Sequence, residues 1–103
     1  MHVGQTIHEQ LKDLNLYSHL AFNRYGTKAS LIEGGLKIVI RGSKNRNVII
    51  SYNEGSDTYD VGMFTTTGEK ISEHKEVYVD QMALLIVDDL EQIDLRMHAP
   101  AMA

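Results

Sequence analysis

The chain has 103 residues, of which 43% are hydrophobic and 23% charged, with a formal net charge of −4 and no cysteine. This length supports one core, so we predict a single domain over residues 1–103. The absence of cysteine excludes disulfides, thiolate zinc sites and thiol nucleophiles. No apolar run reaches the length of a membrane span, about 18 residues, and the first residues lack the layout of a signal peptide. The sequence therefore predicts a cytoplasmic protein without membrane contact.

Charge is divided unevenly along the chain. Residues 1–50 contain seven bases and three acids, which gives a net charge of +4, whereas residues 51–103 contain three bases and eleven acids, which gives −8. Such a division favours either one surface for anions and another for basic partners, or two solvated surfaces that keep a small domain soluble.

The first predicted element is a short helix that ends near Asn15. Thr6 and Glu9 have the spacing of a capping box, in which each side chain satisfies a free backbone donor of the first turn. Three apolar residues follow at helical spacing and predict a buried face: Ile7, Leu11 and Leu14. Residues 16–25 lack a clean period, so they predict either a connecting turn or a second short helix that is stopped by Gly26.

From Ala29 the apolar residues recur with the period of two that is typical of strands. Gly34 and Gly35 favour a tight hairpin, because glycine readily adopts the positive φ that such turns require. The later loops, at residues 42–45, 53–57 and 67–69, are too short for parallel crossovers, so we predict an antiparallel sheet of four or five strands. The alternating sets are Leu36, Ile38 and Ile40, then Val48, Ile50 and Tyr52, then Tyr59, Val61 and Met63, with a last strand over residues 71–79.

A carboxy-terminal helix completes the predicted α+β fold. Asp80 is the expected amino-terminal cap, and residues 97–103 are expected to form a flexible tail. Five apolar residues form a stripe at helical spacing, and burying such a stripe on the sheet would strongly stabilise the fold. They are Met82, Leu85, Ile86, Leu90 and Ile93.

The same helix contains the candidate protein-binding residues Asp88, Asp89, Glu91 and Asp94. Adjacent helical residues point about 100° apart, so Asp88 and Asp89 do not form a convergent acid–base dyad. The cluster indicates either a solvated face or an acidic docking surface for a protein with a basic groove.

The loop that follows the second strand contains the candidate anion-binding residues Arg41, Lys44 and Arg46. Three cations beside glycine and small polar residues can contact phosphate. The loop lacks the signature of a phosphate-binding loop, and no aromatic stacking residues are interleaved with it. It therefore predicts either a charged hairpin tip or a weak, sequence-independent contact with nucleic acid.

Other catalytic patterns are missing from the sequence. The five histidines lie at least six residues apart, which does not match the spacing of metal ligands on a helix. There is also no glycine-x-serine-x-glycine elbow. We expect no metal site and no cofactor, and we expect that the protein is not an enzyme.

Two segments, residues 56–61 (SDTYDV) and 76–82 (EVYVDQM), resemble small accessory proteins of tailed phages and prophages. Those proteins are similar in their short first helix, a glycine-containing hairpin like residues 33–36, a basic strand and loop, and a closing helix. The resemblance covers about residues 5–95, and the chain departs from it at Asp88 and Asp89. It implies an accessory protein in the bacterial cytoplasm during infection, and it implies no activity and no catalytic residue.

These observations favour a non-enzymatic acidic interaction protein, in one form a phage-encoded inhibitor of a host defence or nucleic-acid-processing complex. The alternative is a weak nucleic-acid-binding or regulatory module that uses the basic loop. A third hypothesis is a protein that associates with itself, the +4 half of one copy meeting the −8 half of the next.

Overall fold

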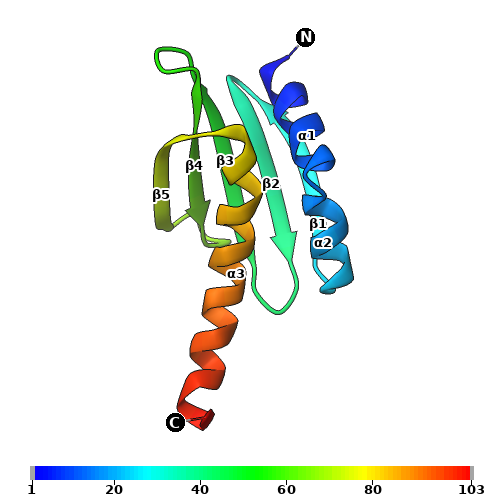
Figure 1. The fold of residues 1–103 in the computed structure, drawn as a ribbon, viewed down its shortest axis with the longest axis vertical. Coiled ribbons are helices and arrows are strands. Elements are labelled where there is room, and N and C mark those ends of the chain that lie inside the picture. The colour runs from blue at the N-terminus through cyan, green and yellow to red at the C-terminus, as the bar shows by residue number, and fades with distance from the viewer. Residues whose placement is uncertain (1, 103) are drawn as a thin grey trace.

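The computed structural model describes the backbone of residues 2–102 and the side chains of residues 2–90. Two helices precede five strands, and a third helix follows them, which confirms the predicted α+β fold (Figure 1). The elements are α1 (Val3–Asp13), α2 (Leu16–Phe22), β1 (Gly26–Ile32), β2 (Gly35–Arg41), β3 (Arg46–Asn53), β4 (Thr58–Phe64), β5 (Lys70–Val77) and α3 (Val79–Met102).

The five strands form one sheet in the order β1-β2-β3-β4-β5, and every neighbouring pair is antiparallel. This is the predicted meander. Glu33 and Gly34 form the tight turn between β1 and β2, where Ile32 is opposite Gly35. Gly34 has a φ of 72°, a conformation that costs glycine little.

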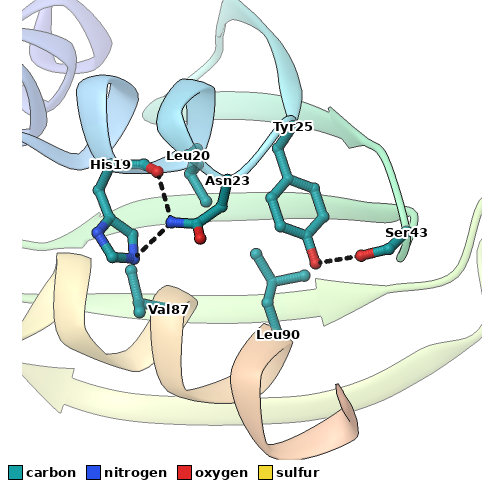
Figure 2. Close-up of a pocket in the computed structure, with 7 residues that line it drawn as sticks. All are labelled: His19, Leu20, Asn23, Tyr25, Ser43, Val87 and Leu90. Carbon is teal, nitrogen blue, oxygen red and sulfur yellow. Dashed lines mark hydrogen bonds between the residues drawn. The ribbon is translucent and has the colours of Figure 1, made fainter.

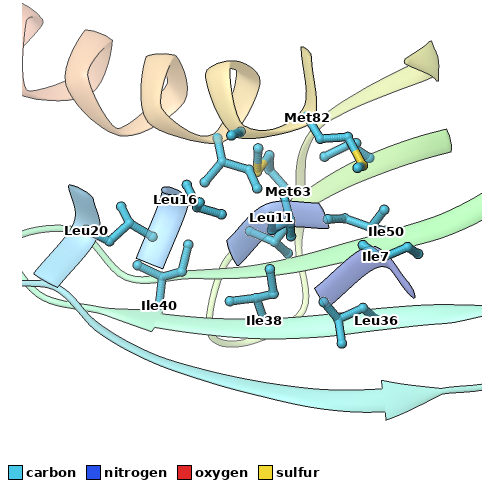
Figure 3. Packing of buried hydrophobic residues seen from close by; sticks show 14 of the residues in the cluster. Ile7, Leu11, Leu16, Leu20, Leu36, Ile38, Ile40, Ile50, Met63 and Met82 are labelled. Carbon is cyan, nitrogen blue, oxygen red and sulfur yellow. The ribbon is translucent and has the colours of Figure 1, made fainter. Parts of the chain in front are cut away.

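All three helices lie on the same face of the sheet (Figure 1). The alternating apolar residues of β2, β3 and β4 point toward the helices and are buried. Figure 3 shows how side chains of the helices and of the sheet interdigitate into one core. Its members include Ile7 and Leu11 of α1, Leu16 and Leu20 of α2, Leu36, Ile38 and Ile40 of β2, and Met82, Ile86 and Leu90 of α3.

The first helix begins earlier than the capping box predicts. α1 starts at Val3, and its cap is His2, whose Nδ1 accepts a hydrogen bond from the backbone N–H of Gly4 at 2.9 Å. Thr6 therefore lies inside the helix rather than at its start. Leu14, predicted to be on the buried face, lies just after the helix, and its side chain is 38% exposed.

Within residues 16–25, Leu16–Phe22 forms the second short helix, one of the two predicted alternatives. The helix stops at Asn23 and Arg24, not at Gly26, because Arg24 adopts a φ of 67° and turns the chain. β1 then begins at Gly26, three residues before the predicted start of the alternation.

In α3 the predicted apolar stripe is largely confirmed. Met82, Ile86 and Leu90 are buried and Leu85 is partly buried, while the side chain of Ile93 lies outside the described residues. Asp80 lies within the first turn of the helix and is not its cap. The predicted tail at 97–103 falls on the last part of α3, which continues to Met102, and its flexibility stays a prediction.

Candidate functional site

The predicted acidic and basic sites are connected by one ion pair. Arg46, at the start of β3, places its Nε 3.3 Å from Oδ2 of Asp89 in α3, and these side chains are only 14% and 19% exposed. The structure therefore brings together one residue from each predicted site, although they are 43 positions apart. Asp88 is exposed on α3, whereas the side chains of Glu91 and Asp94 lie outside the described residues.

Arg41 is also engaged within the protein. Its Nη1 donates hydrogen bonds to the backbone oxygens of Ile40 at 2.9 Å and Arg46 at 3.3 Å, and both Nη atoms lie 3.3 Å from Oδ1 of Asn47. These contacts join the facing ends of β2 and β3. Lys44, in the intervening loop, is partly buried. Of the three predicted cations, Arg41 thus stabilises the β2–β3 hairpin and Arg46 binds Asp89 of α3.

An apolar groove separates α3 from the corner between α1 and α2. It has a volume of about 220 Å³. Leu84 of α3 is 62% exposed and lines this groove together with the partly exposed Leu14. We call this feature the interhelical groove, and its lining residues are Leu14, Asn15, Leu16, His19, Ala83, Leu84 and Val87.

The outer surface of α3 continues this apolar feature. Leu84 and Leu85 border a second depression together with Gln81 and Asp88. A carboxylate therefore lies directly beside the exposed leucine. The sequence pattern indicates Asp88 but not Leu84 or Leu14, because Leu84 is outside the buried stripe and Leu14 has the spacing of a buried residue.

A small polar pocket of about 100 Å³ adjoins the interhelical groove and shares His19 and Val87 with it (Figure 2). Asn23 donates a hydrogen bond from Nδ2 to the backbone oxygen of His19 at 2.9 Å and lies 3.4 Å from Nε2 of the same histidine. Opposite them, the hydroxyls of Tyr25 and Ser43 share a hydrogen bond of 2.9 Å. These bonds hold the polar groups in place at the end of the groove.

Two tyrosines have pKa values above the ordinary value. Tyr17 shares a hydrogen bond of 2.8 Å with Nδ1 of His8, and burial raises the pKa of Tyr17 to about 12. Tyr52 donates a hydrogen bond of 2.6 Å to Asp57, and this bond raises the pKa of Tyr52. Both hydroxyls act as neutral donors or acceptors in local contacts that connect neighbouring segments.

The described residues contain no group of three or more histidine, aspartate or glutamate side chains placed to hold a metal ion. No helix in the described part of the chain is long and apolar enough to cross a membrane. No protein-family model, curated protein or solved structure matches the chain.

Proposed function

We propose that this protein is a non-enzymatic binding module that receives a segment of a protein partner in the interhelical groove. The observation that carries the proposal is the exposure of Leu84 and Leu14 on opposite walls of one apolar groove. A large aliphatic side chain left in water loses the stabilisation of burial, about 1.5–3 kcal/mol, which a partner can supply.

The charge around the groove defines the partner's chemistry. Asp88 borders Leu84 on α3, Asp80 lies in the first turn of the same helix, and residues 51–103 have a net charge of −8. The complementary segment is an amphipathic helix with apolar anchors at helical spacing and basic side chains beside them.

Of the four predicted acidic residues, Asp88 is the one that supports the proposed contact. Asp89 is paired with Arg46 and largely buried, so displacing it would leave a buried guanidinium without its carboxylate. Asp88 is exposed and lies at the apolar patch. The proposed contact is therefore formed by Asp88 with the two leucines.

The finer form of the proposal is a phage-encoded inhibitor that occupies a basic surface of a host protein complex in the bacterial cytoplasm. The resemblance of residues 56–61 and 76–82 to phage accessory proteins supports it. For the nucleic-acid alternative, Arg41 and Arg46 are the relevant residues, and both are engaged within the protein, which weakens that alternative.

The test compares Leu84→Glu with the wild-type protein in affinity capture from bacterial lysate, with and without nuclease. We expect one protein to be captured in stoichiometric amount regardless of nuclease, and Leu84→Glu to reduce its recovery at least tenfold. Ile71→Glu is the matched control, because Ile71 is an exposed aliphatic residue on β5. Equal capture by Leu84→Glu, or loss of the captured proteins after nuclease treatment, would contradict the proposal.

A further inference from the structure

The two edges of the sheet differ in how they are protected against pairing with another strand. β5 contains the charged residues Lys70, Glu73, Lys75 and Glu76, and its pairing with β4 shifts register twice. Glu76 adopts a φ of 56° at one of these irregularities. Charges and bulges are the usual devices that prevent edge-to-edge association.

β1 has almost none of these devices. It pairs with β2 in unbroken register over all seven residues, and Lys28 is its only charged residue. Most of its residues are exposed, and Leu31 is 52% exposed at the edge. α1 and α2 lie over β1 on one face of the sheet (Figure 1), and β1 is the end strand of the sheet order, so no strand of the described sheet pairs with its outer side.

The turn determines which backbone groups of β1 point outward. In a two-residue hairpin the residues that flank the turn exchange hydrogen bonds, and hydrogen-bonded pairs then alternate along the ladder. Ile32 flanks the turn, so Ser30, Lys28 and Gly26 also bond toward β2. The backbone N–H and C=O groups of Thr27, Ala29 and Leu31 consequently point away from the sheet.

We propose that a second copy of this chain pairs with this edge, β1 against β1 and antiparallel, about a two-fold axis at Ala29. This register places Thr27 opposite Leu31 of the second copy and Ala29 opposite its own equivalent. All outward-pointing groups then find partners, in about six hydrogen bonds. The product is a continuous sheet that runs through both copies.

The side chains favour this register over its neighbours. Centring the pair on Lys28 would place two lysines directly opposite each other, which is destabilising. Centring it on Ser30 would place Thr27 opposite the turn residue Glu33 and lose hydrogen bonds. When the pair is centred on Ala29, Lys28 lies opposite Ser30 of the second copy, so no like charges face each other.

This self-complementarity is what favours a second copy over a foreign strand. The exposed Leu31 meets Thr27 of the second copy on the helix side, and each half of β1 presents the outward-pointing backbone groups that the other half requires. A contact of this size forms a weak dimer, with an expected dissociation constant of about 1–100 µM. The dimer contact does not involve the interhelical groove, so the result of its test is independent of the proposed function.

Single-cysteine variants test both the dimer and its register, because the chain has no cysteine of its own. Lys28→Cys and Ser30→Cys both alter exposed positions on the face of the sheet opposite the helices. Residues opposite each other in a non-hydrogen-bonded pair have Cα atoms about 4.5 Å apart, within the range of a disulfide. In a glutathione redox buffer we expect disulfide dimers in a mixture of the two variants, and not with either variant alone.

Every other outcome overturns the proposal. Dimers of Lys28→Cys alone or Ser30→Cys alone would indicate one of the rejected registers. No disulfide in the mixture, together with a wild-type monomer at about 300 µM in sedimentation, would exclude the dimer. A dimer that dissociates in 1 M salt would indicate charge-driven association, and crosslinking of Lys28→Cys only to another lysate protein would assign the edge to a foreign strand.

Discussion

Gly4 is a helical position at which the fold requires glycine, although alanine ordinarily stabilises a helix more. It lies in the first turn of α1, where alanine is usually more favourable than glycine by about 1 kcal/mol. A Cβ at this position would, however, overlap the carbonyl oxygen of Gly35 in β2. The absence of a side chain thus allows the helix to approach the end of the first hairpin closely.

We therefore expect Gly4→Ala to destabilise the protein by about 1–3 kcal/mol, in spite of the gain in helix propensity. Urea unfolding followed by circular dichroism measures the free energy of unfolding. Gln5→Ala, at the exposed neighbouring position, is the control and should change stability by less than about 0.5 kcal/mol. A stabilised Gly4→Ala variant would show that α1 does not contact Gly35 as the structure has it.

Tyr17 gives a prediction for alkaline pH. Its pKa is raised to about 12 in the folded protein, so between about pH 10 and 12 the unfolded chain releases a proton that the folded chain retains. The free energy of unfolding therefore falls as the pH rises through this interval, and the contribution of Tyr17 is complete only below pH 10. Because the side chain is only half-buried, we expect a loss of about 1 kcal/mol.

The measurement compares urea unfolding of wild type and Tyr17→Phe at pH 9 and pH 11.5. Phenylalanine cannot ionise, so the variant should lose less stability over this interval than wild type. Tyr78→Phe, which alters an exposed tyrosine, should behave as wild type. Identical pH profiles for wild type and Tyr17→Phe would contradict the assignment.

Among the elements, the ion pair of Arg46 and Asp89 connects the β2–β3 hairpin to α3. Both side chains are largely buried and their charged atoms lie 3.3 Å apart. A double-mutant cycle with Arg46→Ala and Asp89→Ala should give a coupling energy of about 1–2 kcal/mol, because a shielded pair is weakly screened by solvent.

The control cycle uses Lys70 and Glu73 on β5, which lie at the same distance of 3.3 Å but are 52% and 39% exposed. Exposed pairs contribute about 0–1 kcal/mol, so this coupling should be clearly smaller. Equal coupling in the two cycles would show that burial does not strengthen the contact with α3.

The sequence does not predict this ion pair, because its two residues are 43 positions apart and local patterns do not contain such contacts. The strands and their antiparallel order follow from local periodicity and short loops, as with Ile38 and Ile40 of β2. The start of α1 does not, because the close approach of Gly4 to Gly35 is a tertiary contact that no local capping pattern contains. The interhelical groove was missed for the same reason: the exposure of Leu84 depends on how α3 lies beside α2.

At the scale of the whole molecule, the described elements form two layers with one core between them. The helix-facing side of the sheet contains fully buried residues, such as Ile38, whereas residues on the other face, such as Ile49, remain half-buried. Both are isoleucines on neighbouring central strands, β2 and β3. Substituting each of them therefore measures how much the same side chain contributes to stability on each face of the sheet.

We expect Ile38→Ala to cost about 3–5 kcal/mol, because it removes buried methyl groups and leaves a cavity beneath the helices. Ile49→Ala should cost about 1 kcal/mol, since its side chain already contacts water in the folded protein. Urea unfolding at a low protein concentration, where the chain is monomeric, measures both. Equal costs would mean that the face opposite the helices is buried in solution as deeply as the core, and the two-layer arrangement would then be wrong.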